Sequence, residues 1–477
     1  MAYNYNQATR FNTDGNAQDV LISGNNAYVT DGSSGLQILD VTDPTNPILS
    51  STYSGGNYEN LSNFSFFSGT LGLFGFTNPI AVYEQTKGWD ILNVDLTDPS
   101  NPVTVSVLDS LQISFTQELS NSGDGYVSGN YVYVADGEFG LQVFNVADIT
   151  NSASMEYLTR MATSVTATGS YDTDGIASGV FVEGNSAYVA DGEFGLQIID
   201  ITDPTNPILA GSYDTAGTAT DVSVSGSFAY VADTTGLQII DVSNPSAPTA
   251  AYVYEASEET TGVSVYGNYI YVTDGNAGLK VLNLIDGSAS DDSLSGSGSK
   301  EVMLGSSGAD TIKGFGGADV LAGGGDNDKL LGGGGADTMV GGNSNDVLVG
   351  GGGSDVLIGV NPYEDNPGAG EKDLLQGSAG ADTFVLGDEN NIFYYDNGLT
   401  KADGNAGRAT IKDFDSNEGD IIQLNINGTY ELVEINGSTR IYATSDSGPD
   451  DYIAIVSGVT GLDLADSSQF DYAGSVL

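Results

Sequence analysis

An acidic side chain returns at every ninth position from Gly287 to Ile358, after glycines and two residues before a large apolar residue. Residues 323–359 read GGGDNDKLLGGGGADTMVGGNSNDVLVGGGGSDVLIG. In the pattern GGxGxDxUx, where U is apolar, six residues form a tight turn that needs glycine and three form a short strand. Two such units make one turn of a flattened right-handed β-roll, so acids 18 residues apart stack on one edge.

The same register passes through the irregular unit GVNPYEDNP at 359–367 and resumes afterwards. If that unit takes one half turn of the roll, each edge carries its own column of acids. We expect one edge to hold Asp292, Asp310, Asp328, Asp346, Glu364 and Asp382, and the other to hold Glu301, Asp319, Asp337, Asp355 and Asp373. The apolar positions are Leu294, Met303, Ile312, Leu321, Leu330, Met339, Leu348, Leu357, Leu374 or Leu375, and Phe384 or Thr383.

Stacked carboxylates, together with turn carbonyls that glycine leaves uncovered, make an all-oxygen cage of the kind Ca²⁺ prefers. Mg²⁺ demands a smaller, stricter octahedron and fits less well. The chain has 64 acids against 12 bases, a formal net charge of −52, so bound cations would relieve strong self-repulsion. We therefore predict several bound Ca²⁺ ions and a segment that is disordered without them. A flexible glycine-rich linker would have no reason to keep acid and apolar residues in phase.

These nonapeptides resemble the RTX, or haemolysin-type calcium-binding, repeats over residues 287–386. Departures are Ser306 and Phe315 in place of glycine, and Glu301 and Glu364 in place of aspartate, which we leave out of the predicted ligands. The predicted metal-binding residues are Asp292, Asp310, Asp319, Asp328, Asp337, Asp346, Asp355, Asp373 and Asp382.

A second, longer repeat fills residues 1–285. NAYVTDGSSGLQILDVTDPTNPILSSTY at 26 returns as SAYVADGEFGLQIIDITDPTNPILAGSY at 186. Six units follow when the glycine before each LQI-like strand is aligned, and alternating apolar residues give each unit about four short strands, the size of one propeller blade. We predict a six-bladed β-propeller. The last unit lacks its outer strand, and we expect residues 9–12 to supply it and so remove a free sheet edge.

These units resemble the LVIVD repeats of predicted bacterial surface propellers, in phrases such as YVADG and GLQIIDVS. The second unit departs, and its Phe64, Phe66, Phe67, Phe74 and Phe76 form either a docking patch or an atypical blade core. The recurring Asp31, Asp136, Asp191, Asp233 and Asp274 could form a ring of binding groups, but closure of an Asp-Gly hairpin is the favoured interpretation.

Residues 387–477 alternate like strands and would cap the roll, whose open end would otherwise be an aggregation template. Asp413, Asp415 and Asp420 either add a last metal site or are exposed turn carboxylates, and the second interpretation is favoured. The segment resembles the domain that follows RTX repeats in many exported bacterial proteins, cyanobacterial ones in particular. That resemblance implies type I secretion through an uncleaved C-terminal signal. Correspondingly, we expect neither an N-terminal signal peptide nor a membrane span.

The whole chain is thus predicted to be all-β, with a propeller at 1–285, a β-roll at 286–386 and a cap at 387–477. Its charge disfavours nucleic acid and anionic membranes as partners, and the absence of histidine and cysteine excludes histidine bases and thiolate chemistry. We expect a secreted, calcium-binding structural or adhesive surface protein, not an enzyme, that associates with itself or with other surface components. The alternatives are a propeller that binds a glycan or peptide and, less favoured, an exported carbohydrate-active enzyme that uses carboxylates.

Overall fold

The fold consists of two compact units, each described by itself. The computed structural model groups residues 5–249 and 253–282 in one unit, and 283–477 with 1–4 and 250–252 in the other. Every regular element among the described residues is a β-strand, so the chain is all-β, as predicted. The structure describes residues 9–13, 15–32, 34–53, 58–62, 79–84, 88–95, 103–108, 124–128, 131–145, 167–255, 259–363, 366–388, 390–395, 407–444 and 451–473.

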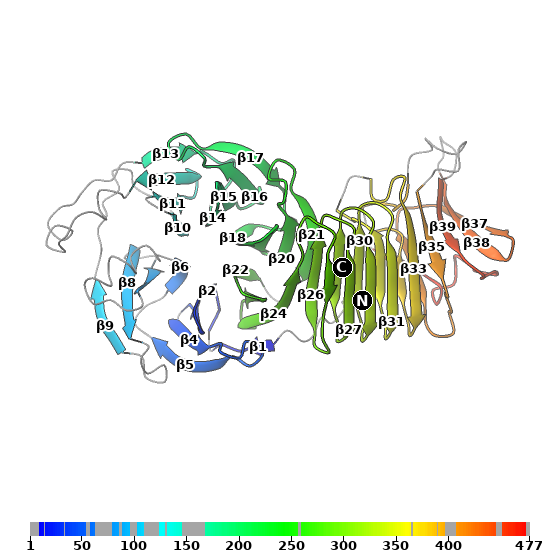
Figure 1. The fold of residues 1–477 in the computed structure, drawn as a ribbon, viewed down its shortest axis with the longest axis horizontal. Helices are drawn as coiled ribbons and strands as arrows, with labels where there is room; N and C mark the ends of the chain where they lie inside the picture. The colour runs from blue at the N-terminus through cyan, green and yellow to red at the C-terminus, as the bar shows by residue number, and fades with distance from the viewer. Residues whose placement is uncertain are drawn as a thin grey trace. The chain divides into compact units, whose positions relative to one another are not determined.

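The first unit is a six-bladed propeller. Five sheets have four antiparallel strands in chain order, and a sixth is completed by β1. The first strand of each sheet lies nearest the centre (Figure 1). The inner strands of the first and last blades are in contact, so the ring of blades closes.

The first blade contains β2 (Asp19–Ser23), β3 (Asn26–Thr30), β4 (Leu36–Asp40) and β5 (Ile48–Tyr53). The second contains β6 (Tyr58–Ser62), β7 (Pro79–Glu84), β8 (Gly88–Asp95) and β9 (Val103–Leu108). The third contains β10 (Gly125–Ser128), β11 (Tyr131–Ala135), β12 (Leu141–Asn145) and β13 (Ala167–Tyr171). The fourth blade contains β14 (Gly179–Glu183), β15 (Ser186–Ala190), β16 (Leu196–Asp200) and β17 (Ile208–Tyr213). The fifth contains β18 (Ala219–Ser225), β19 (Phe228–Asp233), β20 (Gly236–Asp241) and β21 (Thr249–Glu255). The sixth contains β22 (Thr260–Tyr266), β23 (Tyr269–Asp274), β24 (Leu279–Asp286) and β1 (Thr9–Phe11).

The outer strand of the last blade comes from the start of the described chain. Strand β1 pairs antiparallel with β24, with Thr9 opposite Val281 and Phe11 opposite Leu279. This confirms the predicted exchange, in which the two ends of the propeller sequence share one sheet. Because β1 covers the edge of β24, that edge is not free to pair with another chain.

Neighbouring blades pack through apolar side chains that alternate along their strands. Leu196 and Ile198 of the fourth blade cluster with Val222 and Val231 of the fifth, and all are buried. The predicted patch or core in the second blade, Phe64, Phe66, Phe67, Phe74 and Phe76, lies outside the described residues.

The second unit has two sheets that the chain visits in turn, and their strands are parallel except for β37 and β38. One sheet holds β26 (Glu301–Ser306), β28 (Val320–Gly324), β30 (Thr338–Gly342), β32 (Val356–Val360), β34 (Thr383–Val385), β36 (Ile421–Asn425) and β40 (Phe470–Ala473). The other holds β25 (Ser293–Ser295), β27 (Thr311–Gly316), β29 (Lys329–Gly334), β31 (Val347–Gly352), β33 (Lys372–Ala379), β35 (Arg408–Lys412), β39 (Asp451–Val456), β38 (Ser438–Ala443) and β37 (Tyr430–Ile435).

The strand register confirms the 18-residue turn but corrects the prediction for residues 359–367. Leu330 pairs with Leu348, one turn later, whereas Leu348 pairs with Leu375, 27 residues on. The irregular unit therefore adds nine residues to a connection between β32 and β33 instead of forming a half turn. Asp373 consequently lies in line with Asp346, and Asp382 with Asp355, which reverses the predicted edges. Glu364, predicted to lie in a column, falls outside the described residues.

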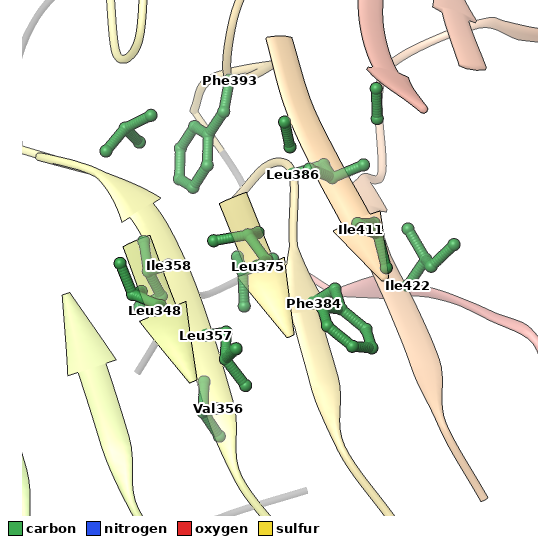
Figure 2. Packing of buried hydrophobic residues seen from close by; sticks show 14 of the residues in the cluster. Leu348, Val356, Leu357, Ile358, Leu375, Phe384, Leu386, Phe393, Ile411 and Ile422 are labelled. Atoms are coloured by element: carbon green, nitrogen blue, oxygen red, sulfur yellow. The ribbon is translucent and has the colours of Figure 1, made fainter. Parts of the chain in front are cut away.

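The core of the roll is one inward column of apolar residues per sheet. Ile312, Leu330, Leu348 and Leu375 are all fully buried, which decides the choice between Leu374 and Leu375. Towards the cap the core widens, and Figure 2 shows Phe384 beside Ile411 and Ile422. Among the C-terminal strands, β35, β36, β39 and β40 thus continue the parallel sheets of the roll, and β38 and β37 extend one sheet in antiparallel order.

Candidate metal centre

Two hydrogen-bonded ladders of acids run along the roll. The backbone N–H of Asp310 donates to Oδ1 of Asp328, and that of Asp328 donates to Oδ1 of Asp346, both at 2.8 Å. The same bond links each acid to the acid one turn later. We call the first ladder column one and the second column two. Column one contains Asp292, Asp310, Asp328, Asp346 and Asp373. Column two contains Glu301, Asp319, Asp337, Asp355, Asp382 and Asp420.

The second carboxylate oxygen of most column members has no partner. These side chains are only 1–2% exposed, and their Oδ2 atoms accept no hydrogen bond within the described part of the chain. A buried, ionised oxygen without a partner is costly, so these oxygens are candidate ligands for a cation. The residues with this orphan oxygen are Asp310, Asp319, Asp328, Asp337, Asp346, Asp355 and Asp382.

A glycine carbonyl lies beside six of the seven orphan oxygens, all except that of Asp382. A Cβ added at Gly323 would overlap Oδ2 of Asp328 and approach the carbonyl oxygen of Gly341, one turn later, to 2.5 Å. At Gly314 it would overlap Oδ2 of Asp319 and come equally close to a carbonyl of the next turn. Glycine is required at these positions because any side chain would fill the space between the two oxygens. Since glycine has no side chain, the carboxylate and carbonyl oxygens face one another.

The donor set fits calcium better than a metal held by side chains alone. No group of three or more acidic side chains able to hold a metal ion occurs in the described ranges. Each candidate site therefore depends on carbonyl as well as carboxylate oxygens, the mixture that Ca²⁺ accepts with six to eight flexible ligands.

Burial makes these acids weak without a cation. It raises the pKa of Asp328 to about 8 and that of Asp346 to about 9, while the N–H bond from the preceding turn lowers each pKa by less. Carboxylates one turn away add to the rise. A bound divalent cation would instead favour the charged form. The pKa is raised to about 6 for Asp310, Asp337 and Asp382, and to about 7 for Asp319, Asp355 and Asp373.

Family comparisons match both repeats. Residues 14–55, 121–172, 174–215, 216–255 and 259–294 match the LVIVD repeat; residues 283–312, 295–330, 331–360 and 367–398 match the RTX calcium-binding nonapeptide repeat. The chain carries LVIVD repeats followed by RTX calcium-binding nonapeptide repeats. The RTX repeats imply calcium binding, and such repeats are typical of type I-secreted extracellular proteins.

Similar solved structures share little sequence with the LVIVD and RTX chain. A computationally designed protein has 8% identity over 58% of this chain and 98% of its own, with a TM-score of 0.36. A gluconolactonase from Xanthomonas campestris has 9% identity over 58% and 92%, with a TM-score of 0.39. A chain from the structure of a mitotic checkpoint complex has 11% identity; the match covers 56% of this chain and 74% of that chain, with a TM-score of 0.34. No curated protein matches the chain.

Four members of the RTX columns, Asp292, Glu301, Asp373 and Asp420, have a second carboxylate oxygen that already accepts a hydrogen bond. Asp292, at the start, is partly exposed, and Ser288 donates to its Oδ2 from both the backbone N–H and the hydroxyl. Asp292 is the first acid of column one, so the ladder has no preceding acid whose N–H could donate to its Oδ1. Ser297 donates its backbone N–H to Oε2 of Glu301 and its hydroxyl to Oε1. Oδ1 of Asp373 accepts the N–H of Asp346, and Oδ2 accepts the hydroxyl of Tyr394.

Of the three C-terminal acids considered from sequence, Asp420 extends an RTX column. Asp420 is buried and its Oδ1 accepts the N–H of Asp382, 38 residues earlier. Asp413 accepts the N–H of Gly377, while Asp415 only orders an exposed turn at Asn417. The nine-residue count could not find Asp420, because its spacing belongs to the cap. No helix among the described residues is long and apolar enough to cross a membrane.

The recurring aspartates of the LVIVD blades have structural contacts. The backbone N–H of Asp191 donates to the carbonyl of Gly195 and closes the hairpin, as the favoured interpretation expected. Its carboxylate, fully buried, also accepts bonds from the Thr173 hydroxyl and the Gly175 N–H. Bonds to a glycine 16 residues earlier recur at Asp31 and Asp233. Sequence analysis missed this second role, since a pattern of turns does not show where a carboxylate is buried.

Proposed function

We propose that the protein is a secreted, calcium-binding structural or adhesive component of a cell surface, such as a surface layer, sheath, matrix or filament, and not an enzyme. The observation that carries the proposal is the set of seven buried Oδ2 atoms without hydrogen-bond partners. When they are ionised, the two ladders of carboxylates repel one another unless cations lie between their oxygens. Bound Ca²⁺ would therefore be part of the folded structure and not an accessory to it.

Calcium-dependent folding accounts for a chain that is exported before it folds. A metal that binds the native state alone stabilises it by mass action. Extracellular calcium modules bind at about 10⁻⁴ to 10⁻³ M, above cytoplasmic calcium levels. We infer that the chain leaves the cell through type I secretion with several vacant sites and folds outside, with several Ca²⁺ ions bound. This inference is supported by the RTX matches.

Exposed apolar side chains at repeated places support an adhesive role for the propeller. Ile48 of the first blade and Ile208 of the fourth occupy the same position and are 58% and 53% exposed. Phe139 and Phe194 are 42% and 46% exposed in matching turns of two neighbouring blades. Their repetition from blade to blade offers several separate apolar contact points to another protein. The buried contacts of Asp31, Asp191 and Asp233 support a scaffold in place of a catalytic ring.

A second candidate function is ligand binding at the centre of the propeller. Burial, and then the nearby carboxylates of Asp19 and Asp124, raise the pKa of Asp221 well above its usual range. Asp19 begins β2, Asp124 directly precedes β10 and Asp221 is the third residue of β18. These are the innermost strands of three blades. A glycan or peptide with hydroxyl or amine groups would suit the three acids. A carboxylate-based carbohydrate-active enzyme would use the same acids and is the least favoured reading.

Sedimentation of the purified full chain tests the first proposal. The protein would be chelated and then titrated with Ca²⁺ from about 1 μM to about 10 mM, a range that brackets extracellular calcium modules. We expect a compact species at intermediate calcium and growth to large ordered assemblies at the upper end. A compact monomer throughout would exclude self-assembly and favour the ligand-binding propeller. An expanded chain that does not respond to calcium would contradict calcium-dependent folding.

A further inference from the structure

The last acid of column one differs from those before it in what contacts its second oxygen. The hydroxyl of Tyr394 donates a 2.7 Å hydrogen bond to Oδ2 of Asp373, and both side chains are buried. The equivalent oxygens of Asp310, Asp328 and Asp346 accept no hydrogen bond from any residue that the structure describes. Since Oδ1 of Asp373 also accepts the N–H of Asp346, this carboxylate is hydrogen-bonded at both oxygens.

The tyrosine hydroxyl stands where a glycine carbonyl stands in the other turns. A Cβ at Gly341 would overlap the carbonyl oxygen of Gly359 and approach Oδ2 of Asp346 to 2.5 Å. One turn later, a Cβ at Gly359 would overlap the Tyr394 hydroxyl and approach Oδ2 of Asp373 to 2.7 Å. A neutral phenol that donates to the carboxylate places a proton between the two oxygens. A cation at that point would have to displace the proton.

The surrounding chain holds Tyr394 firmly in this position. Its backbone has φ of 63°, a left-handed conformation that bulky residues adopt only when their surroundings impose it. Its N–H donates to the carbonyl of Pro367 at 2.7 Å. A Cβ at Gly368 would lie 2.8 Å from the Tyr394 ring, so glycine makes room for it. The contact is therefore built by three separate features of the loop and the cap.

We propose that Tyr394 closes the last position of column one to calcium, so that Asp373 is a hydrogen-bond acceptor and not a metal ligand. The hydroxyl takes the place of the ion as the partner of the second carboxylate oxygen in this turn, and calcium sites in column one end at Asp346. Column two ends differently: Oδ2 of Asp382 has no hydrogen-bond partner among the described residues, and Oδ2 of Asp420, the last acid, accepts the backbone N–H of Asp415. This inference rests on the proposed calcium-binding function and specifies which of the RTX acids serve it.

The test is the number of Ca²⁺ ions bound per full-length chain, measured by equilibrium dialysis at saturating calcium. We expect Asp373→Asn to bind as many ions as the wild type, and Asp346→Asn to bind fewer. Tyr394→Phe keeps the ring and removes the hydroxyl, so we expect it to bind one ion more than the wild type. The double variant Tyr394→Phe, Asp373→Asn should return to the wild-type number.

The outcomes separate this inference from the function on which it rests. Loss of an ion in Asp373→Asn, or in Tyr394→Phe, would overturn the inference while leaving calcium binding intact, since either result makes the residue a ligand. An unchanged number in Tyr394→Phe would also overturn it. A wild-type chain that binds no calcium would instead reject the proposed function itself. If Tyr394→Phe does not fold, the comparison of Asp373→Asn with Asp346→Asn still decides between acceptor and ligand.

Discussion

The backbone N–H of Asp328 and the carboxylate of Asp346 are joined by a 2.8 Å hydrogen bond that links consecutive turns of the roll. One oxygen of Asp346 is thereby fixed by the backbone, and the other is left facing a glycine carbonyl of the next turn. The ladder thus positions the carboxylate independently of the metal. The affinity of each site then depends on the free oxygen, and removing its charge should weaken binding without altering the fold of the turn.

Replacement of Asp328 by asparagine tests the role of the free oxygen. Mutation of a residue that only orients a metal ligand weakens metal binding about 10- to 100-fold. Asp328 is itself a proposed ligand, so we expect the calcium concentration at half-maximal folding to rise at least roughly tenfold. Asp326→Asn is the matched control, because it removes the same charge two residues away at an exposed position. Circular dichroism during a calcium titration would measure both midpoints. Equal shifts in the two variants would show that net charge, and not the ladder, sets the affinity.

The metal-free roll should become more stable in acid. Burial raises the pKa of the column acids to between about 6 and about 9, above the usual value of about 4 in an unfolded chain. A raised folded-state pKa contributes stability that is complete below the unfolded value and is lost as the pH rises through the folded value. In chelator, stability of the roll should therefore fall as the pH rises from about 4 to about 9, and β-structure should be lost toward the upper end of that range. With saturating calcium this loss should be absent; persistence of the loss would contradict metal binding at these acids.

Calcium binding should release protons for the same reason. At pH 7, Asp328 and Asp346 are mostly protonated without metal, because burial raises the pKa to about 8 and about 9. Binding requires the charged form, so ions displace these protons. Calorimetric titration in two buffers of different ionisation enthalpy would measure the release. Asp328→Asn should release fewer protons than the wild type, and no buffer dependence would contradict the assignment.

The nine-residue spacing was sufficient to predict the roll and its inward side. Leu330 and Leu348 are buried and paired one turn apart because every unit repeats the same turn and strand. The spacing did not predict the path of residues 359–367. Pro362 and Pro367 disfavour another strand there, and lengthening the connection costs little in loop-closure entropy. The count continued through this segment, so Asp373 and Asp382 were assigned to the wrong edges.

The contacts that end the columns could not be predicted from the repeat. Tyr394 meets Asp373 across 21 residues, and Asp420 meets Asp382 across 38, both through segments without periodic sequence. Such contacts depend on how the cap folds back onto the roll. Burial of Asp191 in the propeller is a similar case, because Asp-Gly identifies the turn but not the loop that surrounds its carboxylate.

Phe315→Gly should stabilise the calcium-bound roll. Phe315 pairs with Gly333 in the next turn and has φ of 70°, while its side chain is 61% exposed. A left-handed conformation costs a side-chain-bearing residue roughly 1–2 kcal/mol, and little buried contact offsets this. We expect a higher thermal midpoint in saturating calcium. Lys313→Gly, in the same strand, is the control and should lower it; a lower midpoint for Phe315→Gly would show that the ring packs against a partner.

Asp191→Ala should destabilise the propeller regardless of calcium. The substitution leaves the Thr173 hydroxyl and the Gly175 N–H without their buried acceptor, which costs about 1–3 kcal/mol for each such group. Asp203→Ala is the control, because Asp203 accepts bonds only within its own exposed turn, from Thr205. Thermal unfolding with and without calcium would compare the two. An effect of Asp191→Ala that vanishes in calcium would place this residue in the metal-dependent part of the fold.

Removal of residues 1–12 should open the last blade of the propeller. The outer strand of that blade is β1, and Thr9, Arg10 and Phe11 pair with Val281, Lys280 and Leu279 of β24. Without β1, the edge of β24 exposes unpaired backbone groups, and Phe11 no longer packs beside buried Tyr271 and Leu279. We expect a lower thermal midpoint and calcium-independent aggregation on heating, measured by light scattering. Removal of residues 1–8 is the control because it leaves β1 in place; if both truncations behave like the full chain, the exchange of β1 does not hold the ring closed.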